Sequence, residues 1–134
     1  MAVRIYGVTR LVKELDSKFG KRRMNAIVSN ALDKASLVMG MEIQRQLKTF
    51  KDTGATMNEM TIRPPKDDRK GQSAIIHWQG PKSRYRIIHL NEWGHFTRDG
   101  RFRKPAGFGK IAKALQNGKK QYSAVLRDEI RRSL

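Results

Sequence analysis

A long run of apolar residues at helical spacing constrains the fold of this chain more than any other feature of its sequence. The run begins at Met24 and ends at Phe50, and it covers about seven turns of a helix. Its apolar positions are Met24, Ile27, Val28, Ala31, Leu32, Ala35, Val38, Met39, Ile43, Leu47 and Phe50. The pattern predicts one amphipathic helix that buries a face along its whole length. Gly40 would mark a bend or a close contact in it, and residues 52–54 would end it.

Segments of shorter pattern lie on either side of this helix. Apolar residues recur at helical spacing in residues 8–20 and again in residues 111–130. In the second segment we expect a break into two helices at Asn117-Gly118. Because 134 residues are about the size of one domain, we expect a single α+β domain over residues 1–134. In this fold a long N-terminal helix packs on a small antiparallel sheet of about three strands, and a C-terminal helix completes the core.

The strands are expected in the middle of the chain. Short runs rich in Ile, Thr, Tyr and Trp predict strands at residues 60–63, 74–79 and 85–90. An exposed, charged loop over residues 66–72 would connect the first two, and a hairpin turn over residues 80–83 would connect the last two.

Composition excludes several kinds of chemistry. The chain has no cysteine, so it has no disulfide, zinc-thiolate site, iron–sulfur cluster or thiol nucleophile. Its longest apolar stretches are far shorter than the ~20 residues of a membrane-spanning helix. The N-terminus also lacks the hydrophobic region of a signal peptide. We therefore expect a soluble product, made in the cytoplasm, with no membrane partner.

The charge of the chain is unusual. Lys and Arg number 29 against 12 acidic residues, which gives a net charge of +17, whereas a small domain more often carries a magnitude of about 2 to 8. Residues 1–67 carry 13 basic and 7 acidic side chains, and residues 68–134 carry 16 and 5. An excess of this size is typical of proteins that work beside a polyanion or an acidic partner, and it is strongest in the second half. The alternative is that the charge is spread evenly over a monomer and serves only its solubility.

Catalytic and metal-binding patterns are weak. His89, Glu92 and His95 lie close in sequence, but their spacing differs from the H-E-x-x-H motif and would not bring them together on a helix. No serine stands in a Gly-x-Ser-x-Gly elbow, and no phosphate-binding Gly-x-x-x-x-Gly-Lys loop is present. The glycines of residues 107–110 precede a helix whose N-terminus could attract an anion, although such a pattern is more often a simple connection. We expect no catalytic residue, no metal and no cofactor.

A basic segment with interleaved aromatic residues is the more informative pattern. Residues 95–109 read as a flexible basic loop whose cations are Arg98, Arg101, Arg103 and Lys104. Guanidinium groups can contact phosphates while rings stack on bases or on each other. The alternative is that Phe96, Phe102 and Phe108 anchor the loop on the core while the charges are only solvated.

Several short motifs occur in a familiar order along the chain. They are Thr53, Gly54, Glu92, Trp93, Gly94, Pro105 and Ala106. This order resembles small tail-component proteins of long-tailed DNA bacteriophages, in which a T-G turn follows the long helix, an E-aromatic-G signature follows a strand, and a P-A element leads to the last helix. The resemblance spans residues 24–134. The chain departs from the family pattern at Met57, at His95 and in the basic stretch 101–104.

The resemblance implies a non-enzymatic structural protein of the virion, of the neck or tail-completion type. Such subunits form rings, commonly sixfold, that join the tail to the DNA-filled head. The partners implied are other copies of the chain and the neighbouring connector, tail-terminator and tail-tube proteins. Nonspecific contact with double-stranded DNA in the axial channel is also implied. In this setting the basic loop would face either the channel or an acidic neighbour, and Glu92, Trp93 and Gly94 would lock a neighbouring subunit or close the core.

Two other functions fit parts of the sequence. One is a free-standing protein that binds nucleic acid without sequence preference through its basic half. The other is a metal-dependent nuclease that uses His89 or His95, which would need a carboxylate cluster beside the histidines.

Overall fold

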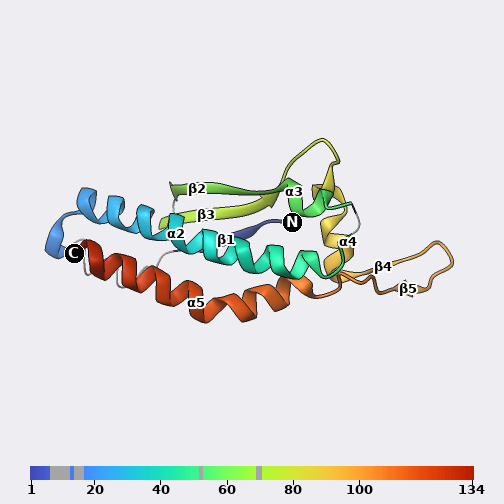
Figure 1. Ribbon diagram of the computed structural model, residues 1–134. Helices are drawn as coiled ribbons and strands as arrows, with labels where there is room; N and C mark the ends of the chain where they lie inside the picture. Colours follow the sequence, from blue (N-terminus) through green and yellow to red (C-terminus); the bar gives the residue numbers. More distant parts are fainter. Residues whose placement is uncertain (7–12, 14–16, 52, 69–70) are drawn as a thin grey trace.

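Two long antiparallel helices run the length of the molecule, α2 (Lys21–Lys48) and α5 (Lys110–Ser133), as Figure 1 shows. The computed structural model describes residues 1–6, 13, 17–51, 53–68 and 71–134. Helix α2 packs against α5 on one side and against a three-stranded sheet on the other (Figure 1). The fold is α+β, as predicted from the sequence. Of the helix predicted over residues 8–20, residues 13 and 17–19 are helical, whereas residues 8–12 and 14–16 lie outside the described residues.

Helix α2 confirms the strongest sequence prediction. Its buried residues include Met24, Leu32, Ile43 and Leu47, which repeat at the predicted spacing and face the core. Gly40 marks a close contact. A Cβ built on it would lie 2.8 Å from Cδ1 of Ile62, so the absence of a side chain lets the sheet approach the helix closely.

The sheet has the strand order β1-β3-β2, with both pairs antiparallel. The strands are β1 (Val3–Tyr6), β2 (Met60–Asp68) and β3 (Gly71–Trp78). The exposed loop predicted over residues 66–72 is wrong, because β2 and β3 run through most of it. Strand β2 passes Pro64 and Pro65 through an irregularity in register between Arg63 and Lys66. Prolines are tolerated there because β2 is an edge strand.

The strand predicted over residues 85–90 is also wrong. This segment forms the 3₁₀ turn η1 (Arg84–Arg86) and the helix α4 (Ile88–Trp93), and the third strand comes from β1 instead. The physical reason is a distant side chain. Glu59, buried at the end of the short helix α3 (Ala55–Glu59), accepts hydrogen bonds from the backbone N–H groups of Lys82 and Arg84 and holds this segment in a turn.

The break predicted at Asn117-Gly118 does not occur, since α5 is continuous from Lys110 to Ser133. Gly118 is buried against α2, and a Cβ at this position would lie 3.0 Å from Sδ of Met39. The glycine therefore allows close packing of the two long helices and does not end the helix. A salt bridge of 2.9 Å between Lys34 and Glu129 also links them.

Candidate functional site

A β-hairpin projects from one end of the molecule (Figure 1). Strands β4 (His95–Phe96) and β5 (Phe102–Arg103) pair antiparallel within the segment that the sequence indicates as a loop. The backbone N–H of Thr97 donates to the carbonyl of Arg101 over 2.8 Å, and that of Gly100 donates to the carbonyl of Thr97 over 3.0 Å. The basic segment over residues 95–109 therefore begins as a hairpin with a defined turn.

Asp99 organises the tip of this hairpin. The Thr97 hydroxyl donates to its carboxylate, and the Arg101 backbone N–H does so as well. These hydrogen bonds, that of Thr97 above all, lower the pKa of Asp99 from its ordinary value. The Arg101 guanidinium lies 3.6 Å from the same carboxylate.

The rings of the hairpin lie at the surface. Phe96 is 73% exposed, Phe102 50% and Phe108 38%, and Trp93 at its base is 63% exposed. Phe102 contacts Phe96 edge-on at a centroid distance of 5.3 Å and Phe108 at 6.4 Å. None of the three phenylalanines belongs to the core cluster. The interpretation that they anchor the loop on the core is therefore wrong, and they form a small aromatic cluster of their own.

The four cations predicted for this segment are all exposed. Arg101 pairs with Asp99, and the Lys104 ammonium lies 4.9 Å from the centre of the Phe108 ring. Among the residues that the structure describes, no acidic side chain forms an ion pair with Arg98, Arg103 or Lys104. Hereafter "basic hairpin" means residues 93–104, with these four cations and the exposed rings of Trp93, Phe96 and Phe102.

Glu92 caps the start of helix α5. It is buried, and its two carboxylate oxygens accept hydrogen bonds from the backbone N–H groups of Ile111 (2.8 Å) and Ala112 (2.9 Å) at the start of α5. Its own carbonyl accepts the N–H of Gly109 over 2.9 Å. A carboxylate at this place satisfies two donors that the first turn of a helix leaves unpaired. Glu92 thus fixes the segment that connects the basic hairpin to α5.

Gly94 is the point where α4 ends and the hairpin begins. Its φ of 72° and ψ of −179° lie in a region that only glycine adopts readily. A Cβ here would also lie 2.5 Å from the Phe102 ring and 2.8 Å from the Arg103 carbonyl oxygen. The sequence places Glu92, Trp93 and Gly94 at a strand end, but they lie at the C-terminal end of a helix. They divide their roles, since Glu92 and Gly94 shape the backbone and Trp93 is exposed.

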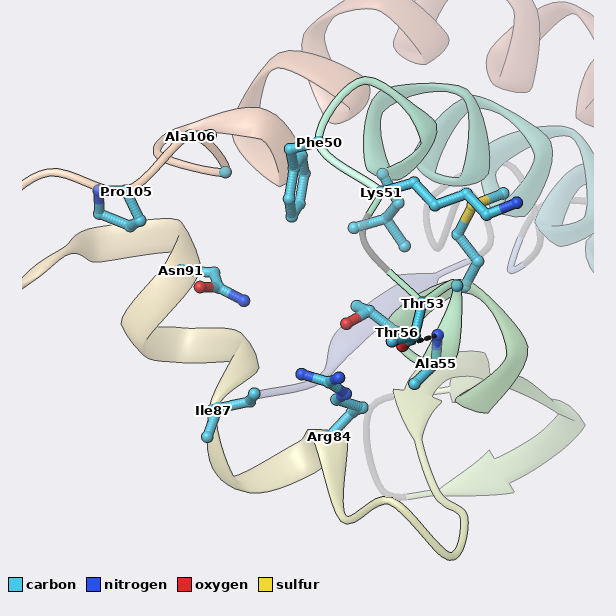
Figure 2. A pocket seen from close by; sticks show the side chains of 14 residues that line it. Phe50, Lys51, Thr53, Ala55, Thr56, Arg84, Ile87, Asn91, Pro105 and Ala106 are labelled. Atoms are coloured by element: carbon cyan, nitrogen blue, oxygen red, sulfur yellow. Dashed lines mark hydrogen bonds between the residues drawn. The ribbon is translucent and has the colours of Figure 1, made fainter.

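The other motif residues meet around a pocket. Thr53, Gly54, Pro105 and Ala106 all line it, although they are far apart in sequence (Figure 2). Gly54 has a φ of 84° and begins helix α3. Glu59 and Arg84, two further residues that shape or line this region, were missed by the sequence analysis, because neither stands in a recognisable motif.

The described residues contain no group of three or more His, Asp or Glu side chains that could hold a metal ion. Of the trio His89, Glu92 and His95, Glu92 already uses both oxygens on backbone donors. No helix in the described part of the chain is both long and apolar enough to cross a membrane.

Comparison of the chain with models of protein families, with curated proteins and with solved structures finds no match.

Proposed function

We propose that the protein is a non-enzymatic structural subunit of a phage virion, of the tail-completion or neck type, which forms a ring and joins the tail to the DNA-filled head. The proposal combines the sequence resemblance with one structural observation. That observation is the basic hairpin, which projects from the body with exposed rings and with three cations, Arg98, Arg103 and Lys104, that form no ion pair with a described acidic side chain. Exposed aromatic groups of this extent are characteristic of surfaces that a partner covers.

In the proposed ring, each subunit offers two different surfaces to its neighbours, since a ring needs a heterologous contact. The hairpin would supply one of them, through Trp93 and Phe96 at its apolar part. Its cations would then face an acidic neighbour or the DNA in the channel. On this proposal the protein resides in the virion after synthesis in the host cytoplasm.

The test is electron microscopy of particles made by a phage whose genome carries this gene with an early stop codon. The expected result is full heads beside finished but unattached tails. Normal particles would refute the proposed function.

A variant with Arg98, Arg101, Arg103 and Lys104 all changed to Glu then tests the hairpin within this function. Its matched control changes four exposed α5 cations to Glu, namely Lys113, Lys119, Lys120 and Arg127. Both variants alter the net charge equally, so loss of joining only in the hairpin variant would locate the contact on the hairpin. Equal joining in both variants would remove the hairpin from the proposal.

A second candidate function is nucleic-acid binding without sequence preference by the isolated protein. The exposed Arg98 and Arg103, which form no ion pair with a described acidic side chain, favour it together with the exposed rings of Phe96 and Phe102. Fluorescence anisotropy with two duplexes of unrelated sequence tests this function. Equal affinities are expected, and each should fall with salt with a slope of about −0.9 for each phosphate contacted. A strong preference for one duplex at constant salt would contradict it.

A further inference from the structure

A pocket of about 280 Å³ lies beside the segment that leaves the basic hairpin (Figure 2). Separate parts of the chain supply its walls: the end of α2, the start of α3, the turn η1, helix α4 and residues 105–107. Its apolar lining includes Leu47, Phe50 and Ile87. A hollow built from so many segments has a shape that the whole fold determines.

Two buried carboxylates hold opposite walls of this pocket. Glu59 accepts the backbone N–H of Arg84 over 2.7 Å and so fixes the turn that carries Arg84. Glu92 fixes the start of α5 and, through it, residues 105–107. Gly107 packs against the ring of Phe50, where a Cβ would lie 2.7 Å from the nearest ring carbon. The pocket is therefore preorganised and needs no folding step on binding.

Two cations, Lys51 and Arg84, are among the residues that line the pocket, and both are hydrogen-bond donors. The side chains of Arg84 and Asn91 extend into it from one side (Figure 2). Nε of Arg84 is buried and has no hydrogen-bond partner in the described part of the chain. No described lining residue is acidic. A buried guanidinium nitrogen without a partner costs free energy, and an anion that lets Arg84 reorient and pair would offset that cost.

We propose that this pocket binds the carboxylate side chain of an acidic peptide segment from a partner protein. A planar carboxylate matches the fork of the Arg84 guanidinium, and the apolar walls fit the residues that flank the acid. A duplex phosphate fits less well, because the pocket admits a side chain and not a double helix. The inference rests on the pocket alone and does not depend on the proposed function.

The test is an NMR titration of the ¹⁵N-labelled full chain with two blocked peptides, Gly-Leu-Glu-Leu-Gly and Gly-Leu-Gln-Leu-Gly. The acidic peptide is expected to shift the signals of Asn91, Ala106 and Gly107 and to bind about tenfold more tightly than the neutral one, as a charge-assisted hydrogen bond implies. Equal affinity of the two peptides, or no shift at these residues, would overturn the proposal.

The variant Arg84→Gln should abolish the difference between the peptides. Its matched control is Arg86→Gln, because Arg86 lies in the same turn but is exposed and hydrogen-bonded to Tyr85. If Arg84→Gln perturbs the fold, Asn91→Ala is a second variant of the pocket lining, and it should weaken binding of the acidic peptide. A short DNA duplex is a further probe, with inorganic phosphate as its control. Displacement of the acidic peptide by the duplex at a lower concentration than inorganic phosphate requires would assign the pocket to nucleic acid instead. Because these measurements use the free protein, their outcome is independent of whether tails join heads.

Discussion

The two tryptophans of this chain lie in opposite surroundings. Trp78 ends strand β3, is only 3% exposed and donates its indole N–H to the Thr56 carbonyl over 3.0 Å. Trp93 ends helix α4 and is 63% exposed at the base of the basic hairpin. Trp78 thus helps to exclude water from the core, whereas Trp93 and the neighbouring rings of the hairpin remain in contact with water. Apolar surface lowers the free energy only when it is removed from water. The exposed rings of the hairpin are therefore suited to binding a partner, whereas the buried rings stabilise the fold.

Replacement of each tryptophan by alanine tests this difference most directly. Trp78→Ala removes a buried ring and its hydrogen bond, and it should lower the free energy of unfolding by about 4 kcal/mol. Trp93→Ala should change it by no more than about 0.5 kcal/mol. Urea denaturation followed by circular dichroism measures both. A large loss in Trp93→Ala would mean that the hairpin end belongs to the core.

Glu92 connects the two regions, because it lies beside the hairpin and caps a helix of the body. Glu92→Ala leaves the N–H groups of Ile111 and Ala112 without their partner, at a cost of about 3 kcal/mol. Asp128→Ala, an exposed change on α5, is the control and should be nearly neutral. If Glu92→Ala were equally mild in urea denaturation, the carboxylate would have a role other than capping.

Gly94 tests how rigidly the hairpin is attached. Gly94→Ala combines backbone strain with a clash against Phe102, and it should destabilise the hairpin by about 2 kcal/mol. Gly100→Ala also has a positive φ, of 82°, but nothing lies within 4 Å of its added Cβ, so about 1 kcal/mol is expected. Amide hydrogen exchange at Thr97 reports the stability of the hairpin in both variants. Equal exchange rates would show that the contact with Phe102 contributes nothing.

The sequence predicted correctly those helices and strands whose own residues carry a clear pattern of apolar spacing. Helix α2 follows from its apolar repeat, because that signal is continuous in sequence. The cations and rings of residues 95–109 also stood out in sequence, but the segment was predicted as a flexible loop and its first part forms a hairpin. The predictions that were wrong concern segments that contact residues far away in the sequence. Glu59 holds the turn before residues 85–90 through the N–H of Arg84, and Gly118 lies within a continuous helix where it packs closely on Met39. Strand β1 has four residues, too few for a clear periodic signal. The pocket could not be foreseen, since it exists only where separate segments meet.

Tyr122, in the body of the molecule, is the position at which we expect the smallest effect. It lies on α5, packed against the core, and burial raises the pKa of Tyr122 from 10.0 to about 12. A group with a raised pKa stabilises the fold fully below pH 10 and loses that contribution as the pH rises toward 12. With solvent screening the loss is about 1 kcal/mol. Tyr122→Phe should therefore flatten the fall in unfolding free energy over this range, measured by urea denaturation at stepped pH. An equally steep fall in Tyr122→Phe and in the wild type would contradict this prediction.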